Sequence, residues 1–231
     1  MEESIKAKFQ FGGRTFRIYV HPEMEKNKLG QMEPTDTISK KIWNGKTFYE
    51  LSKMQEMLVH IKDDTVVFDC GANIGNHTVF WGSCCKEVHA FEAFPQSFEL
   101  LEKNMAVNHI QGKAYQVLLG NSPGRYKAVT TKISRGATHF VLDPDGSFES
   151  VRLDDIVDPA IKPGFIKIDV EGDELELLRG AKRILSECHR ILWIEIHFFY
   201  HNDLDVQVLN ELKQYGYAEG VDVFLSRRRK K

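Results

Sequence analysis

The stretch VFDCGANIGNHT, residues 67–78, decides the fold. With Thr65 and Val66 before it, the run at 65–70 is apolar and rich in β-branched residues, which predicts a strand covered on both faces. The chain then turns through Gly71 and Gly75 into a helix. Glycine permits a sharp turn and a close approach of the backbone to a ligand. This stretch therefore predicts a strand, a glycine turn and a helix.

Short apolar runs alternate with helical patterns along the rest of the chain. Strands are predicted at 65–70, 87–94, 165–170, 191–199 and 221–226, and helices at 97–108, 171–185 and 204–216. Such alternation predicts an α/β fold with a mostly parallel sheet and helices on both faces, whose ligands bind at the carboxyl ends of the strands. Residues 113–153 contain several further short strands, and their pairing is left open.

The first 60 residues show a different pattern of apolar and polar residues. Apolar and polar residues alternate around Gly12-Gly13 within 8–20, which predicts a β-hairpin. A polar stretch at 21–37 is interpreted as a loop, and roughly 47–61 as an amphipathic helix. We expect residues 1–60 to form a small cap of hairpin, loop and helix beside a main domain at 61–231.

Composition limits the class of protein. The 231 residues contain 31 Lys+Arg and 33 Asp+Glu, a formal charge of −2, and 42% hydrophobic residues. This is too apolar for disorder, and the charge gives no reason to expect a general nucleic-acid binder. No apolar segment resembles a signal peptide or a membrane span, so a cytoplasmic location is predicted. Four cysteines are expected to be reduced thiols: Cys70, Cys84, Cys85 and Cys188.

The glycine turn suggests the ligand. A dinucleotide fingerprint, G-x-G-x-x-G, needs glycine at 71, 73 and 76, but Asn73 and Asn76 stand there, which argues against a nicotinamide cofactor. An acid at Asp69, two residues before Gly71, with Gly75 four residues later, suits a loop that holds S-adenosyl-L-methionine. The helix start that follows offers free N–H groups to an anionic group.

Glu92 supports this interpretation, because it ends the next predicted strand. A carboxylate there can accept two hydrogen bonds from ribose hydroxyls, and Phe91, Ala93 and Phe94 can supply an apolar face for adenine. The predicted cofactor-binding residues are Asp69, Gly71, Asn73, Gly75, Asn76, Thr78, Glu92, Ala93, Phe94 and Asp169.

Two later strands carry further charged residues. Alternation places Lys167 and Asp169 on one face of their strand, and a buried lysine needs an anionic partner, for which Asp169 and Glu195 are candidates. His197 near the end of the next strand is a candidate general base, because an unperturbed imidazole titrates near neutral pH. A hydrogen-bonded structural histidine is the alternative. His77 is interpreted as a loop residue rather than a base. Convergence of the acids on a metal cannot be read from sequence, and no metal is predicted.

Five segments together resemble the FkbM-type methyltransferases, a branch of the class I S-adenosylmethionine-dependent enzymes. They are FDCGANIGNHT, HAFEAFPQSFELLEKNMAVN, RLDDIV, FIKIDVEGDELELLRGA and WIEIH, and the resemblance covers about residues 42–218. It implies a Rossmann-like, seven-stranded methyltransferase sheet and methylation, usually of a hydroxyl oxygen, on a sugar or glycan, a polyketide or another small molecule. It also implies that Asp169 and Glu171 border the active site. With His197 they are the candidate catalytic residues.

Other functions remain open. The acceptor could be RNA or protein, although VEGDE follows the strand where amino-group methyltransferases carry an N-P-P-Y or D-P-P-Y clamp. A catalytically inactive cofactor-binding module is a further alternative. The basic run at 227–231 is interpreted as a solvated tail. Oligomeric state and acceptor identity are not predicted.

Overall fold

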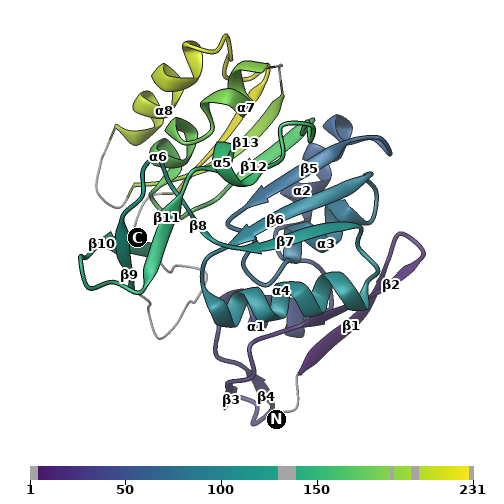
Figure 1. Ribbon diagram of the computed structural model, residues 1–231. Coiled ribbons are helices and arrows are strands. Elements are labelled where there is room, and N and C mark those ends of the chain that lie inside the picture. Colours follow the sequence, from purple (N-terminus) through teal and green to yellow (C-terminus); the bar gives the residue numbers. More distant parts are fainter. Residues whose placement is uncertain (1–4, 130–138, 188–189, 199–202, 229–231) are drawn as a thin grey trace.

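A six-stranded sheet forms the centre of the protein in a computed structural model that describes residues 5–129, 139–187, 190–198 and 203–228 (Figure 1). Every neighbouring pair of strands is parallel. From edge to edge the strands are β14 (Val223–Arg228), β13 (Ile191–His197), β12 (Phe165–Ile168), β5 (Val66–Cys70), β6 (Glu87–Glu92) and β7 (Gly112–Gln116). The predicted parallel α/β fold is confirmed, with six strands in this sheet where the resemblance implied seven.

The strand order creates a switch point beside β5. From β5 the chain moves outward to β6 and β7, whereas the later strands β12, β13 and β14 add on the opposite side. Loops that follow neighbouring strands at such a point run to opposite faces of the sheet, which leaves a crevice between them. The crevice therefore lies where β5 and β12 end.

Two hydrophobic cores cover the two faces of the sheet. Strand alternation sends Val67 and Phe165 to one face and Phe68 and Ile166 to the other. Helices α3 (Asn76–Gly82) and α4 (Pro95–Val107) contribute to the first core. The second core includes side chains from α6 (Glu174–Arg179), α7 (Lys182–Glu187) and α8 (Leu204–Lys213). Both faces are thus shielded, which explains why the strands read as nearly continuous apolar runs.

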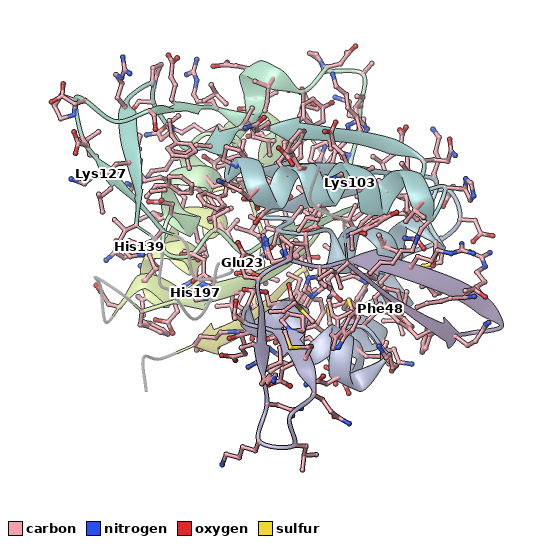
Figure 2. The ribbon with its side chains drawn as sticks, turned by 90° about the horizontal axis from the view of Figure 1, so that it is seen from below. Glu23, Phe48, Lys103, Lys127, His139 and His197 are labelled. Carbon is pink, nitrogen blue, oxygen red and sulfur yellow. The ribbon has the colours of Figure 1, made fainter. Side chains whose placement is uncertain are left out.

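The predicted N-terminal hairpin is present as β1 (Lys6–Phe11) and β2 (Arg14–Tyr19), joined at Gly12-Gly13. Its Phe9 ring lies 5.0 Å from the ring of Phe48, which in turn lies 5.2 Å from that of Phe80 in α3. Phe48 is labelled in Figure 2, close to the hairpin. Because the first core continues across residue 60, a separate cap that ends there stays a prediction.

The segment after the hairpin contains more structure than expected. The predicted loop at 21–37 includes a short antiparallel pair, β3 (Met24–Lys26) and β4 (Met32–Pro34). An unpredicted helix, α1 (Thr37–Gly45), begins where the Asp36 carboxylate accepts a hydrogen bond from the Ser39 N–H at 2.8 Å. The predicted helix at 47–61 is shorter, as α2 (Leu51–Met57) followed by a 3₁₀ turn at Leu58–His60.

The remaining strands form a second sheet with the order β10-β9-β11-β8. They are β8 (Leu118–Leu119), β9 (Arg125–Val129), β10 (His139–Leu142) and β11 (Phe148–Val151), and the short helix α5 (Leu153–Ile156) follows them.

Several predicted bounds change at the C-terminal half. The helix expected at 171–185 is divided into α6 and α7, and Glu171 lies outside it with a φ of 54°. Arg227 and Arg228 belong to β14 rather than to a tail, and 229–231 lie outside the described residues, as does Cys188. The three other cysteines are unbridged. Nowhere in the described part of the chain is a helix both long and apolar enough to cross a bilayer.

Candidate functional site

A cavity of about 380 Å³ opens at the carboxyl ends of the central strands, at the switch point. Eight of the predicted site residues lie on its wall: Gly71, Asn73, Asn76, Glu92, Ala93, Asp169, Glu171 and His197. Four others do not reach it: Asp69, Gly75, Thr78 and Phe94. The wall also includes residues that sequence reasoning did not select, among them Lys41, Tyr49 and Arg228.

The turn after β5 requires glycine at its first position. Gly71 has a φ of +77°, and a Cβ atom there would lie 1.8 Å from the backbone oxygen of Asp169. The N–H groups of Gly71 and Ala72 both donate to the Phe91 carbonyl, at 2.9 and 3.0 Å. The turn is therefore held between β6 and the end of β12, with its backbone on the cavity wall.

Glu92 has a fixed orientation at the end of β6. One carboxylate oxygen accepts a hydrogen bond from the Asn73 N–H and the other from the Phe94 N–H, each at 2.8 Å. Burial raises the pKa of Glu92 to about 7, against the effect of these two hydrogen bonds. Each oxygen keeps a further acceptor position, so the carboxylate can receive two hydroxyl groups from a ligand. Phe94 contributes its backbone here.

Lys167 forms a buried ion pair with Asp69. Its Nζ lies 3.0 Å from Asp69 Oδ1 and donates to the Gly71 carbonyl at 2.9 Å, while Thr78 donates to the other Asp69 oxygen at 2.6 Å. Burial alone lowers the pKa of Lys167, but the charges of Asp69 and Asp169 outweigh it and raise that pKa. Asp69 is therefore engaged by Lys167 and Thr78 behind the cavity wall, and its direct contact with a ligand stays a prediction.

The sequence predicts Asp169 or Glu195 as the partner of Lys167. Asp169 lies 3.6 Å from Lys167 Nζ, farther than Asp69. The reason is register: Lys167 stands directly opposite Asp69 in the parallel pair of β12 and β5. Pairing between strands 98 residues apart is not encoded in either strand alone.

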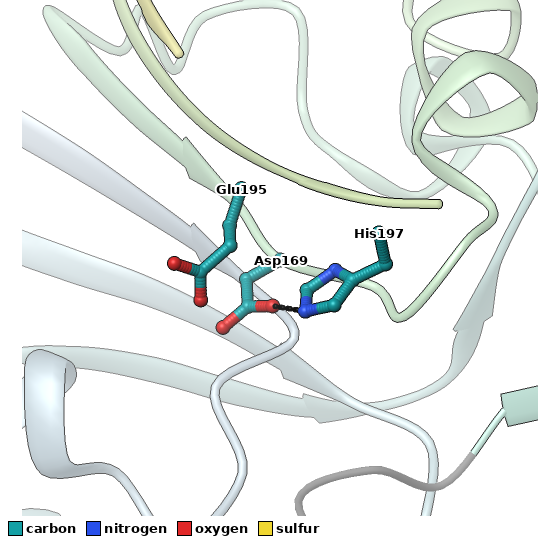
Figure 3. A group of neighbouring side chains, drawn as sticks. All are labelled: Asp169, Glu195 and His197. Carbon is teal, nitrogen blue, oxygen red and sulfur yellow. Dashed lines mark ion pairs between the residues drawn. The ribbon is translucent and has the colours of Figure 1, made fainter. Parts of the chain in front are cut away.

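His197 is surrounded by carboxylates. Its Nδ1 lies 3.1 Å from Glu174 Oε1, and its Nε2 lies 3.7 Å from Asp169 Oδ1 and 3.5 Å from Glu171 Oε2. Figure 3 shows the contact with Asp169. Burial works against the charged imidazole, yet the three carboxylates raise the pKa of His197 to about 9. This shift favours the charged imidazole, and the role of His197 as a general base stays a prediction.

The acids around His197 are also perturbed. Burial, followed by the charge of Asp169, raises the pKa of Glu171 to about 8. The pKa of Asp169 is raised as well, mainly by burial. Glu174 is fully buried, although an acid in a first helical turn reads from the sequence as an exposed partner of the helix dipole. At pH 7 this cluster can therefore offer Glu171 as a hydrogen-bond donor.

Glu195 belongs to a second network that joins three parts of the chain. It accepts from Arg228 at 2.7 Å and lies 3.3 Å from Lys53 Nζ. Lys53 also contacts Glu50 at 2.9 Å, and Arg228 pairs with the same Glu50 carboxylate. This network fastens β13 and β14 to the N-terminal segment.

Oxygen and nitrogen atoms of Asp169, Glu195 and His197 lie within 4.8 Å of one another, as a metal site would require (Figure 3). However, Asp169 already faces Lys167 and Glu195 already faces Arg228. The group is accounted for as part of the two ion-pair networks, and we assign no metal to it.

Comparison with known proteins places the chain in a family. Residues 69–218 match the methyltransferase FkbM domain. The hexuronic acid methyltransferase AglP of Haloferax volcanii is 31% identical over 147 residues, covering 61% of this chain and 59% of that protein. Methyltransferase 1 of Beauveria bassiana is 27% identical, covering 51% of this chain and 59% of its own length. The chain thus spans about three fifths of each of these relatives.

Among solved structures, the methyltransferase FkbM from Methylobacillus flagellatus KT superposes with a TM-score of 0.49 at 22% identity, covering 75% of this chain and 44% of that one. The family match extends from Asp69, at the end of β5, to residue 218, beyond α8, and therefore includes most of the cavity wall. Because the match covers more than half of the sequence, the chain belongs to the FkbM methyltransferase family.

Proposed function

We propose that the protein transfers a methyl group from S-adenosyl-L-methionine to a hydroxyl oxygen of a sugar or another small polyhydroxylated acceptor. The observation that carries this proposal is Glu92, whose two oxygens are each held by a backbone N–H at 2.8 Å beside the turn at Gly71. A carboxylate fixed in this way on a cavity wall suits the two hydroxyls of a ribose.

The cavity wall fits the methyl donor along its length. Ala93, Val117 and Leu118 supply apolar surface next to Glu92, where adenine would lie. Asp169 stands just past the end of β12, where a carboxylate stabilises a positive charge. When bound, S-adenosylmethionine supplies a methyl group on a positively charged sulfur. The protein then mainly aligns the acceptor oxygen with that methyl group and excludes water.

Asp169, Glu171 and His197 are proposed to surround the reacting groups. With a pKa of about 8, the Glu171 carboxyl is largely protonated at pH 7 and can donate a hydrogen bond to the acceptor. With a pKa of about 9, His197 is an imidazolium held by Glu174, and it orients both acids from one side. Asp69 and Thr78 act through Lys167, which they hold in place.

The sugar acceptor is proposed from similarity. A 31% identical relative is named a hexuronic acid methyltransferase, and sugar acids are therefore the first acceptors to test. The cavity wall also carries Thr37, Lys41 and Tyr49 from the N-terminal segment and Phe140 from β10. Polar, cationic and aromatic side chains in one wall suit an acidic sugar ring.

Titration calorimetry tests the donor, with Glu92→Gln as the variant and Glu87→Gln as the matched control on the same strand. The amide must place an N–H against a backbone N–H, so we expect about 10- to 100-fold weaker binding for Glu92→Gln only. Transfer of labelled methyl is then measured to D-glucuronic acid, methyl β-D-glucopyranoside and bulk tRNA. Absence of binding to folded protein at millimolar donor would refute the proposal. Label in tRNA alone would favour a nucleic-acid acceptor.

A further inference from the structure

His77 is a buried histidine on the cavity wall to which the arguments above give no role. It lies in the first turn of α3 and is 6% exposed. Its ring packs against Trp81 and Trp193, with ring centroids 5.3 and 5.4 Å away. These two indoles fix the plane of the imidazole, so the ring is held in one orientation toward its surroundings.

The polar atoms of this ring are not satisfied within the protein. Nε2 is buried and has no hydrogen bond to any described residue. The nearest carboxylate oxygen, Glu50 Oε2, is 3.9 Å from Nε2, beyond hydrogen-bond distance. Buried polar side chains are nearly always paired, so a histidine without a hydrogen bond at Nε2 is exceptional on a cavity wall. His197, by contrast, has three carboxylates around it.

The charges around His77 keep it neutral. Those on the elements packed around it are Glu50, Lys53, Lys167, Glu195 and Arg228. Burial, and then the cations Lys167, Arg228 and Lys53, lower the pKa of His77 well below its ordinary value of 6.5. A neutral imidazole retains one nitrogen with a free lone pair, which can accept a proton.

The charge of Lys167 acts on both His77 and the acid cluster. Lys167 lies 3.6 Å from Asp169 Oδ2, and the same lysine charge acts on the His77 ring. The neutral histidine and the carboxylates are therefore both within the influence of one buried cation, and they border one cavity. An acceptor held against Asp169 and Glu171 has His77 on the same wall.

We propose, on the basis of the function proposed above, that His77 is the catalytic residue that takes the proton of the acceptor hydroxyl. As the bond between the acceptor oxygen and the methyl carbon forms, the carbon–sulfur bond breaks and its electron pair stays on sulfur. The hydroxyl proton passes to the imidazole, which becomes an imidazolium and later releases the proton to solvent. Charge balances, because one cationic sulfonium is replaced by one imidazolium.

Glu50 acts as a positioning residue for this histidine. Its Oε2 faces Nε2, which favours the tautomer with the proton on Nε2 and leaves the lone pair on Nδ1. The other oxygen of Glu50 is held by Lys53 at 2.9 Å and by Arg228. Glu50 thus orients the imidazole without enough surplus negative charge to protonate it.

The first test does not depend on activity. Nitrogen-15 NMR of histidine-labelled protein is recorded from pH 5 to 10, with His77→Asn and His197→Asn used to assign the two rings. We expect the His77 ring to stay neutral to below pH 6.5 and to protonate Nε2 only, whereas His197 titrates near 9. A His77 ring that is charged at pH 7 would overturn the inference.

The second test separates this inference from the proposed function. His77→Asn and His77→Gln are compared with wild type for donor affinity by calorimetry and for kcat toward D-glucuronic acid. Folding is checked by urea unfolding. We expect unchanged donor affinity and a kcat lower by about 10²- to 10⁴-fold, with loss of the acid limb of the pH–rate profile, which His197→Asn retains.

The outcomes are distinct. Equal kcat in wild type and both His77 variants refutes the role of His77 alone. Donor affinity that falls in parallel with kcat/KM makes His77 a donor-binding residue and also refutes it. A wild-type protein that neither binds the donor nor transfers methyl to any acceptor refutes the proposed function, whatever the NMR titration shows.

Discussion

Asp69 and Lys167 stand directly opposite each other on β5 and β12, and their side chains meet inside the protein with 3.0 Å between Oδ1 and Nζ. The same Nζ donates to the carbonyl of Gly71. One buried ion pair therefore connects the two strands on either side of the switch point with the turn that forms the cavity wall.

Lys167→Met should destabilise the protein by about 3–5 kcal/mol, because it leaves the Asp69 carboxylate buried without its cation. Urea unfolding measures the change. The matched control is Lys162→Met, whose lysine pairs with Glu187 at the surface. Such exposed pairs contribute about 0–1 kcal/mol. Equal losses in the two variants would contradict the assignment of a buried pair.

Gly71→Ala should prevent the turn after β5 from closing. Its φ of +77° disfavours alanine, and the new Cβ would lie 1.8 Å from the Asp169 carbonyl oxygen. Gly12→Ala is the control, since Gly12 has a φ of +54° with no atom within 4 Å. We expect Gly12→Ala to lower the free energy of unfolding by about 1–2 kcal/mol, from backbone strain alone. Gly71→Ala should lower it by more. Similar values by urea unfolding would show that the crowding is relieved at little cost.

Stability should depend on His197 between pH 6.5 and 9. The folded-state pKa of about 9 exceeds the ordinary value of 6.5, so the folded protein holds a proton that the unfolded chain releases. The resulting stabilisation is full below pH 6.5 and is lost as the pH rises through 9. Glu171, with a pKa raised to about 8, also makes the folded protein less stable as the pH rises.

As the pH is raised over this range, the free energy of unfolding of the wild type, measured in urea, should therefore fall by roughly 2–3 kcal/mol more than that of His197→Gln. His60→Gln, at a histidine outside the acid cluster, should follow wild type. A wild-type curve parallel to that of His197→Gln would mean that the three carboxylates do not retain a proton on this ring.

Asn76→Asp should loosen the segment that carries Tyr49. The Asn76 side chain accepts from the Tyr49 N–H and donates to the Tyr49 carbonyl, both at 2.9 Å. A carboxylate keeps the first hydrogen bond and repels the carbonyl, so we expect a loss of about 1–3 kcal/mol. Amide exchange at Tyr49 should become faster relative to amides in α4. Unaltered exchange at Tyr49 would indicate that other contacts hold this segment.

The sequence predicts the sheet well because its strands are shielded on both faces and therefore appear as apolar runs such as 65–70 and 165–170. Gly71 and Glu92 are also predictable, since each follows a recognisable strand at a fixed spacing. The broken helix at 171–185 is not. Glu171 and Gly172 adopt positive φ values of 54° and 114°, and the polar pattern there also fits a helix.

The roles within the site depend on contacts between distant segments. Glu174, which the sequence pattern alone places at the surface, favours the charged form of His197, whereas burial, followed by the charges of Lys167 and Arg228, favours the neutral form of His77. Arg228 itself lies in a run of basic residues that is typical of a solvated end, yet it reaches Glu195 at 2.7 Å. Periodicity and spacing along the sequence do not predict such pairings between distant residues.

The position of Arg228 in β14 also has a consequence for biosynthesis. The cavity wall combines Lys41 and Tyr49 with an arginine that is translated nearly 180 residues after Tyr49. Until that strand is made, Glu50 and Glu195 are without this cation, so a nascent chain cannot complete the cavity wall. The wall should therefore be completed in one step, once Arg228 has been added, rather than gradually.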